Sequence, residues 1–196
     1  MKLFDRGFKS KEVLRDTPFA HEVDHSPDLN QRNRLKHYLK MIDKINEPCL
    51  DIGDTNWIAE QISNKHNVKI ENTLKSDFND SIKTKGEKYE TILCFEVLEH
   101  VMNPSRFLKD IHGLLAPGGI LYLSTPKLAV IPIYHTDAHF VEYKEYGLSR
   151  MFEYCGFKII NSEIFSPFPA WWAMTGFRPF FRTTFHRIQL YKLIKV

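Results

Sequence analysis

The chain has 196 residues, of which 43% are hydrophobic, and a formal net charge of +3 at pH 7. This length and apolar content suit one domain with a sizeable core, and so small a net charge gives no reason to expect a nucleic-acid partner. The chain contains no run of about 20 apolar residues, so no transmembrane helix is expected. It also begins without the apolar segment of a signal peptide. Three cysteines without metal-ligand spacing indicate buried thiols in a reducing cytoplasm.

The N-terminal part, residues 1–46, is predicted to be an extension that ends in a helix covering the core domain at 47–196. Ser26-Pro27-Asp28 is a typical helix start, because a side-chain oxygen accepts the unpaired N–H groups of the first turn. Apolar residues then recur at helical spacing up to about Asn46, namely Leu35, Leu39, Ile42 and Ile45. The pattern predicts an amphipathic helix.

Two short strands are predicted next. Pro48–Gly53 indicates a strand that runs into a turn, and Asn56 is placed to cap a following helix. Asn67–Asn72 indicates the second strand. Only 17 residues separate Glu71 from Tyr89, which is too few for a helix, a strand and two loops. The helix region after the second strand is therefore predicted to be shortened or missing.

The most regular stretch of the chain is 89–126. Thr91–Phe95 is a short apolar run typical of a strand buried on both faces, and Asn103-Pro104 begins a helix. One apolar stripe follows at helical spacing, formed by Phe107, Leu108, Ile111, Leu114 and Leu115. Pro117-Gly118-Gly119 is expected to end this helix before a strand at Ile120–Ser124. Such a strand, helix and strand form a right-handed βαβ unit of a parallel sheet.

The C-terminal part is predicted to contain a helix over about Tyr143–Cys155, a strand at Phe157–Phe165 and a last, antiparallel strand within His186–Val196. Gly156 suits a left-handed residue at the end of the helix. The aromatic-rich insertion at 166–185 is expected to pack into the core. Three alternatives are that it lines an acceptor pocket, docks on a partner or touches a membrane surface.

Together these elements predict an α/β fold with a doubly wound, mostly parallel sheet. Open sheets of this kind bind ligands just beyond the carboxyl ends of their strands. Phe95 and Glu96 stand at that point of the predicted central strand.

The segments FEVLEHVMNP, LLAPGG and LYLSTP resemble the fourth strand, following helix and fifth strand of class I S-adenosylmethionine (SAM)-dependent methyltransferases. The resemblance extends from about Cys49 to Ile160. It implies a seven-stranded, Rossmann-like sheet with an antiparallel last strand, and SAM as the cofactor. It also implies methyl transfer, which we expect to reach an oxygen of a small-molecule or glycan-type acceptor.

The resemblance also implies a set of cofactor-binding residues. PCLDIG is similar to the cofactor motif of the family, in which Asp51 and Gly53 match, while Thr55 and Trp57 replace the next two glycines. The turn from Asp51 to Asn56 would hold the methionine end of SAM; its members include Asp54. At the end of the second strand, Glu71 would bind the ribose hydroxyls, with Asn72 beside it.

Further along, Asp77 would bind the adenine amino group and Phe78 would pack on the purine ring. The alternative for this pair is an Asx turn with a core phenylalanine, and for Glu71 a solvated side chain at a strand end. Phe95 and Glu96 complete the predicted cofactor site.

Glu96, Glu99 and His100 in FEVLEH are spaced i, i+3, i+4, so on a helix all three would share one face. The segment resembles the ExxEH segment of small-RNA 2′-O-methyltransferases and of ubiquinone-pathway O-methyltransferases, where a further histidine enters from downstream. His135 or His139 would play that part here. The set could hold a divalent metal such as Mg²⁺, although a metal-free role is favoured. His100 and His139 are the catalytic candidates, since a loop imidazole can act as a general base on a hydroxyl.

Three other functions are compatible with parts of the sequence. A non-catalytic binding or scaffold protein with the same fold is favoured by the altered glycine turn. A nicotinamide-dependent oxidoreductase is disfavoured, because no G-x-G-x-x-G follows the first strand. A peripheral membrane protein would use the 166–185 insertion.

Overall fold

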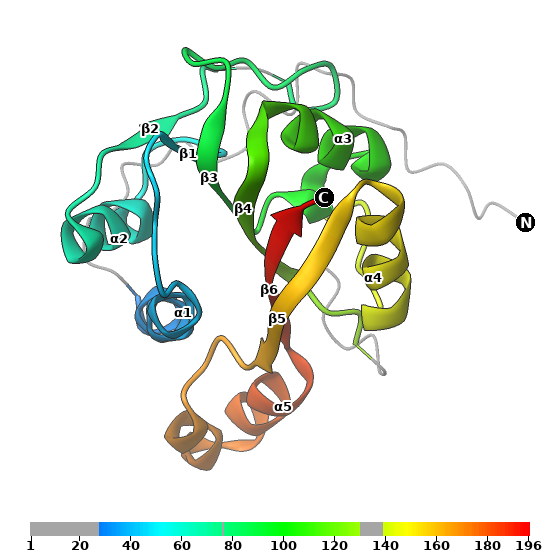
Figure 1. The fold of residues 1–196 in the computed structure, drawn as a ribbon. Helices are drawn as coiled ribbons and strands as arrows, with labels where there is room; N and C mark the ends of the chain where they lie inside the picture. Colours follow the sequence, from blue (N-terminus) through cyan, green and yellow to red (C-terminus); the bar gives the residue numbers. More distant parts are fainter. Residues whose placement is uncertain (1–27, 76, 130–138) are drawn as a thin grey trace, which may run out of the picture.

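The computed structural model describes residues 28–75, 77–129 and 139–196, which fold around one six-stranded sheet with the order β2-β1-β3-β4-β6-β5 (Figure 1). The strands are β1 (Cys49–Asp51), β2 (Ile70–Asn72), β3 (Tyr89–Phe95), β4 (Leu115–Pro126), β5 (Phe157–Phe165) and β6 (Ile188–Lys195). The strands β2, β1, β3 and β4 pair in parallel, whereas β6 runs antiparallel to β4 and β5. This arrangement confirms the mostly parallel sheet and its antiparallel last strand.

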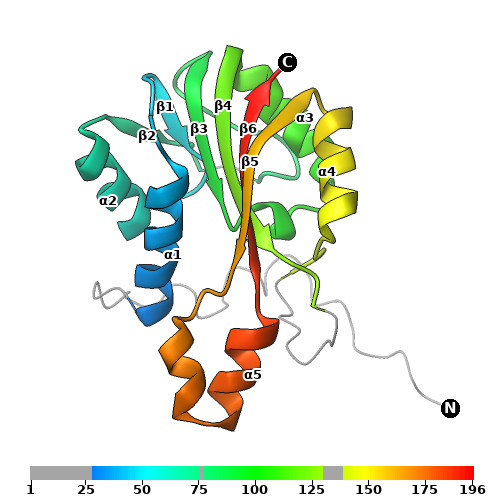
Figure 2. The ribbon, with the colours of Figure 1, turned by 60° about the horizontal axis from the view of Figure 1, so that its bottom comes forward.

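Helices cover both faces of the sheet. The helices of the described residues are α1 (Leu29–Met41), α2 (Trp57–His66), the 3₁₀ helix η2 (Leu98–His100), α3 (Pro104–Leu114), α4 (Glu145–Tyr154), the 3₁₀ helix η3 (Ala170–Thr175) and α5 (Phe177–Phe185). Figures 1 and 2 show α1 and α2 on one face and α3 and α4 on the other. The doubly wound architecture is therefore confirmed.

The helix starts follow the capping rules that were read from the sequence. Asp28 and Gln31 form a capping box at α1, with the Gln31 N–H donating to the Asp28 carboxylate at 2.7 Å. Asn56 caps α2 by accepting the Ala59 N–H at 2.9 Å. Asn103 caps α3, which has a proline in its first turn.

The first helix ends earlier than predicted, at Met41 instead of Asn46. Ile42 has an extended backbone with ψ 96°, and its N–H donates to the Tyr38 carbonyl at 2.8 Å. Ile42 and Ile45 are nevertheless 2% and 7% exposed. Their apolar spacing therefore reflects burial in an extended segment that leads into β1, and not a further turn of helix.

The connection between β2 and β3 explains why the sheet has six described strands and not seven. Among residues 73–75 and 77–88 the structure contains only turns and irregular segments. The helix predicted to be shortened or missing is absent from these residues, and no strand replaces it. Phe78 and Ile82 of this connection pack against the core instead.

The prediction that Pro117-Gly118-Gly119 ends α3 is wrong, because this sequence lies inside β4. The helix ends at Leu114, and the next residue begins the strand, pairing with Tyr89. The register between β3 and β4 then shifts, so that Thr91 pairs with Ile120. Gly118 has φ +74°, a backbone conformation that glycine adopts without strain, and it lets the extra residues bulge out of the ladder.

Two apolar clusters, one on each face, hold the sheet and helices together. The α3 and α4 side contains Leu50, Ile92, Phe107, Leu108, Phe152 and Leu193 among others, and the α1 and α2 side contains Tyr38, Cys49, Ile62, Leu93 and Tyr122. The three cysteines are free and buried, as predicted. At the end of α4, Gly156 has φ +86°, and a Cβ there would lie 2.8 Å from the His112 ring.

The aromatic insertion between β5 and β6 does not pack into the core, so that expectation was wrong. Its residues form η3 and α5, which project beyond the end of the sheet (Figure 2). Neither helix contains a buried residue. Strands β5 and β6 form a hairpin whose long connection folds into a separate pair of helices.

Within the described residues, we find no helix that combines the length and the apolar character needed to cross a bilayer.

A pair of phenylalanine substitutions tests this division between core and projecting helices. Phe107 is 1% exposed, whereas Phe180 on α5 is 51% exposed. We expect Phe107→Ala to lower the free energy of unfolding by about 3–5 kcal/mol, because it leaves a cavity in the core. Phe180→Ala should change it by less than about 0.5–1 kcal/mol. Urea unfolding followed by circular dichroism measures both, and equal losses would contradict the assignment of Phe180 to the exterior.

Candidate active site

The turn after β1 is held by a buried carboxylate. Asp51 is 3% exposed, and its Oδ2 accepts hydrogen bonds from the side-chain amides of Asn56 at 3.1 Å and Asn72 at 3.2 Å. Burial raises the pKa of Asp51 to about 7, against the lowering effect of these two amides. Three of the predicted cofactor residues are thus brought together at the carboxyl ends of β1 and β2.

The same turn forms although Thr55 and Trp57 replace two glycines of the family motif. Gly53 has φ +137°, and a Cβ added to it would meet nothing within 4 Å, so the backbone is open on that side. The Thr55 hydroxyl donates to the Asn72 side chain at 3.3 Å, and Trp57 is the first residue of α2. Side-chain hydrogen bonds therefore fix the turn, while Asp54 is exposed.

The side chains of Glu71 and Asn72 point to opposite faces of the sheet at the end of β2, as those of neighbours on a strand do. Asn72 lies beside Asp51, whereas Glu71 accepts a weak hydrogen bond from the Tyr89 hydroxyl at 3.4 Å. One such bond leaves most of the acceptor capacity of the Glu71 carboxylate for other donors.

Asp77 and Phe78, which are predicted to bind adenine, both make contacts within the protein. The Asp77 carboxylate accepts the Asn79 N–H at 2.9 Å, which is an Asx turn. The Phe78 ring packs against Phe107 with centroids 5.8 Å apart. These contacts match the alternative that the sequence left open for this pair.

Glu96 directly follows β3 and has φ +57°. It therefore does not share a helical face with Glu99 and His100, and the expected three-residue face is wrong, because the only helix here is the short η2. The Glu96 carboxylate instead accepts the Ser124 hydroxyl at 2.8 Å and lies 3.5 Å from the Arg34 guanidinium. Phe95 stacks on Tyr38 with centroids 4.1 Å apart.

Arg34 was missed by the sequence reading, although it reaches this edge of the sheet from α1. Its Nε is buried without a hydrogen-bond partner in the described part of the chain, and so is the Asn30 Oδ1 one turn earlier on the same helix. Buried polar atoms normally have partners. In the sequence, Arg34 looks like any charged residue on the solvent face of an amphipathic helix. No pattern therefore indicated that it reaches the edge of the sheet.

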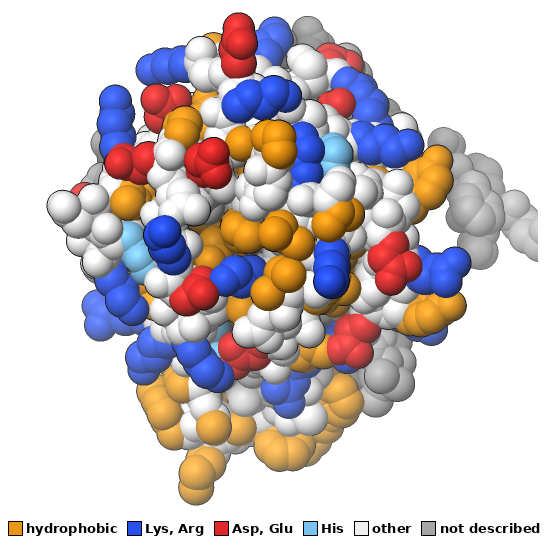
Figure 3. All heavy atoms as spheres, in the orientation of Figure 1, with side chains coloured by type: hydrophobic (Ala, Val, Ile, Leu, Met, Phe, Trp, Pro, Cys, Tyr) orange, Lys and Arg blue, Asp and Glu red, His pale blue; other side chains and the backbone are white. Residues whose placement is uncertain are grey.

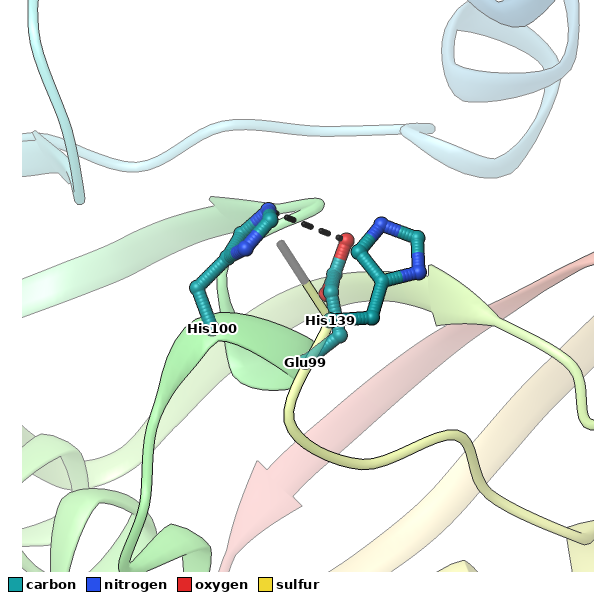
Figure 4. Close-up of side chains that lie close together, drawn as sticks. All are labelled: Glu99, His100 and His139. Carbon is teal, nitrogen blue, oxygen red and sulfur yellow. Dashed lines mark ion pairs between the residues drawn. The ribbon is translucent and has the colours of Figure 1, made fainter. Parts of the chain in front are cut away.

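Glu99, His100 and His139 form a compact cluster in which one ligand atom of each lies within 4.8 Å of the others (Figure 4). The His100 Nε2 is 3.8 Å from the Glu99 carboxylate, and the two imidazole rings are 5.2 Å apart, edge to face. The Phe140 N–H donates to the Glu99 carbonyl at 2.9 Å, which fixes the chain next to His139. His135, the other downstream candidate, lies outside the described residues.

Glu99 is 1% exposed and accepts the Thr125 hydroxyl at 3.0 Å. Burial, together with the charge of Glu96, raises its pKa to about 8. Two imidazoles and one carboxylate suit Zn²⁺ or Mn²⁺ better than Mg²⁺, which prefers oxygen ligands. The cluster is therefore chemically able to hold a divalent cation or to exchange a proton.

A pocket extends the site from the cluster towards α5. Its lining includes Lys127, His139, Glu142, Phe185 and His186. The His139 Nδ1 is 3.4 Å from the Glu142 carboxylate. Burial lowers the pKa of His186 to about 4, and nearby Arg34 and His139 act in the same direction, so His186 is neutral near pH 7. The sequence gave no indication that His186 would lie here, because only the pairing of β6 with β4 brings it to this edge.

A mostly parallel sheet with helices on both faces and an antiparallel last strand is a doubly wound α/β fold, the class of open sheet that binds ligands at the carboxyl ends of its strands. Two solved structures support this class. A SAM-dependent methyltransferase from Mesorhizobium loti aligns with a TM-score of 0.63 at 13% identity, covering 86% of this chain and 100% of that one. Phosphoethanolamine N-methyltransferase 2 from Haemonchus contortus in complex with SAM aligns with a TM-score of 0.59 at 11% identity, covering 83% and 52%. At these identities the likeness shows the fold alone.

The chain belongs to the methyltransferase domain family, whose model matches residues 18–172. Among curated proteins it is similar to the ubiquinone biosynthesis O-methyltransferase of Parvibaculum lavamentivorans, with 41% identity over 46 residues. That match covers 24% of this chain and 18% of the relative. The chain thus spans less than a third of the length of the curated relatives it matches.

The buried Asp51 carboxylate provides a test of the site by pH. Its folded-state pKa of about 7 lies above that of an exposed aspartate, so the folded protein keeps a proton that the unfolded chain loses between about pH 4 and pH 7. The contribution of Asp51 to stability therefore falls as pH rises through that window. We expect the free energy of unfolding of Asp51→Asn, relative to wild type, to rise by on the order of 4 kcal/mol from about pH 4 to about pH 8.

Urea unfolding at a series of pH values measures this difference. Asp54→Asn in the same turn, where the side chain is exposed, is the matched control and should give a difference that does not vary with pH. A constant difference for Asp51→Asn as well would show that its carboxylate is not desolvated.

Proposed function

We propose that this protein transfers a methyl group from SAM to an oxygen of a small-molecule or glycan-type acceptor. The observation that carries the proposal is the position of a histidine pair, His100 and His139, at the same sheet edge as the Asp51–Gly53 turn. Membership of the methyltransferase domain family supports the reaction class. The O-methyltransferase names of the curated relatives support oxygen as the acceptor atom.

The residues at the carboxyl edge suit the chemical groups of SAM. The open backbone at Gly53 allows close approach of a ligand, and the Asp51 carboxylate suits an ammonium group. Glu71 offers a carboxylate to the ribose hydroxyls, an interaction worth roughly 1.5–3 kcal/mol for each charge-assisted hydrogen bond. The orphaned Nε of Arg34 is a donor for a carboxylate. When bound, SAM supplies a methyl group on a sulfonium, which is open to in-line displacement.

In this proposal His139 is the general base. When its Nδ1–H donates to Glu142, the Nε2 is left to accept the proton of the acceptor hydroxyl, and the Glu142 carboxylate stabilises the imidazolium that forms. His100 packs against the His139 ring and limits its rotation. Because orientation alone can supply up to roughly 7–11 kcal/mol, these few side chains are sufficient for the chemistry.

A divalent cation at Glu99, His100 and His139 is the alternative way to activate the hydroxyl. We favour the metal-free base, because Glu142 lies within hydrogen-bonding distance of the His139 Nδ1 and can orient that ring, while His100 contacts it edge to face. Methyl transfer should therefore persist in a chelator. Loss of activity in the chelator and recovery with Zn²⁺ or Mn²⁺ would instead assign the cluster as a metal site.

SAM binding is tested at Glu71. We expect Glu71→Ala to weaken SAM binding at least about tenfold, because two charge-assisted hydrogen bonds are lost. Isothermal titration calorimetry with SAM and its demethylated product measures the affinity. Glu87→Ala, an exposed carboxylate just before β3, is the control and should bind like wild type. Unchanged affinity in Glu71→Ala would remove Glu71 from the cofactor site. A wild-type protein that binds neither compound would favour the non-catalytic binding protein.

The base is tested by replacing His139 with glutamine, which keeps a polar group but cannot take up a proton. We expect kcat for transfer of a labelled methyl group to a panel of phenolic and sugar hydroxyl compounds to fall by about 10²–10⁴, while the affinity for SAM stays close to that of wild type. His112→Gln, on α3, is the control. A His139→Gln protein with unchanged kcat would reduce His139 to a residue that holds its loop.

A further inference from the structure

The aromatic lobe, which we define as residues 166–187, exposes an unusual amount of apolar surface. Trp171 is 58% exposed, Met174 88%, Phe177 82% and Phe180 51%. Figure 3 shows hydrophobic side chains gathered at the end of the molecule where η3 and α5 lie. Large exposed apolar patches usually mark a surface that binds a protein or a membrane.

Contacts between aromatic rings hold the lobe together. The rings of Phe177, Phe181 and Phe185 follow one another along α5 with centroid distances of 4.7 Å and 5.7 Å. Before the other helix, Phe168 stacks on Trp172 of η3 with centroids 4.3 Å apart. Six of the seven phenylalanine and tryptophan rings of the lobe take part in such ring contacts. Trp171, Phe177 and Phe180 are nevertheless more than half exposed, so the packed lobe presents an apolar outer surface.

The charges on the lobe all have one sign. Arg178, Arg182 and Arg187 lie within it, and the sequence contains no aspartate or glutamate from residue 164 to the C-terminus. Arg178 is exposed next to Phe177. Exposed aromatic residues interleaved with arginines, without acidic residues, are typical of helices that lie at the interface of an anionic membrane.

We propose that the aromatic lobe docks on the surface of an anionic lipid bilayer. Trp171, Met174 and Phe177 enter the headgroup region, and Arg178 and Arg182 lie at the lipid phosphates. The exposed side chains cluster around the turn between η3 and α5, a projecting end that meets a flat surface more readily than a folded protein groove. The positive charge complements anionic lipid directly, and this proposal does not depend on the reaction at the site.

Docking in this way has a geometric consequence for the site. Helix α5 runs from the exposed Phe177 to Phe185, which lines the pocket with His139. Nine residues of helix span about 13 Å. The pocket would therefore stand at most that far above the membrane surface, within reach of a polar head that projects from it.

Vesicle flotation of the full chain tests the proposal. Wild type should float with vesicles that contain phosphatidylglycerol much more than with pure phosphatidylcholine, and added salt should weaken the binding. Trp171→Ala combined with Phe177→Ala should lower the partition coefficient at least about tenfold. Arg178→Gln should lower it by about fivefold.

The matched control is Tyr146→Ala combined with Tyr154→Ala, two aromatic residues on α4 that are 77% and 71% exposed, and it should float like wild type. The circular dichroism spectrum and the midpoint of urea unfolding must be the same in all variants, which separates loss of docking from loss of the fold. The proposal would be overturned if the wild-type protein did not float with anionic vesicles. So would concentration-dependent dimers in light scattering that disappear in the Trp171→Ala, Phe177→Ala protein, because the lobe would then join two copies of the chain.

Discussion

The geometry of the site depends on Tyr38, whose packing and hydrogen bond hold α1 against the ends of β3 and β4. Tyr38 is fully buried and stacks on Phe95. Its hydroxyl lies 2.8 Å from the Ser124 hydroxyl, which in turn donates to Glu96. Burial raises the pKa of the Tyr38 phenol, so it stays protonated and able to donate. Arg34 of the same helix closes the loop at Glu96, so one helix is bound twice to the carboxyl edge of the sheet.

The fold stabilises three carboxylates at that edge by neutral donors more than by countercharges. Asp51 has two amides, Glu99 has a threonine hydroxyl, and Glu96 has a serine hydroxyl besides Arg34. Burial raises the pKa of Asp51 and of Glu99, so these two carboxyl groups keep their protons to higher pH than exposed ones do. The edge is consequently poised to change its charge when a cationic ligand or a proton acceptor arrives, and it is the part of the molecule where local sequence rules give way to function.

Local patterns in the sequence were sufficient for most of the framework. The caps at Asp28, Asn56 and Asn103 and the β3-α3-β4 unit follow from side chains that act within a few residues. Arg34 and His186 could not be found in that way, because they reach the site through helix packing and through an antiparallel strand pair. The left-handed backbone at Glu96 likewise follows from its bonds to Ser124, which no local spacing encodes. The aromatic lobe shows the opposite limit, since hydrophobicity predicts burial only where another surface is available to cover it.

The reactivity of the three buried thiols can report how often the surrounding structure opens. Cys49 is on β1, Cys94 on β3 and Cys155 at the end of α4, and burial raises the pKa of each thiol, to about 12 for Cys49. Since the thiolate is the reactive form, an alkylating reagent can modify them only when the surrounding structure separates. The rate at Cys94 would then report opening of the sheet centre, and the rate at Cys155 would report release of α4, so one reagent would rank the local stabilities of the two regions.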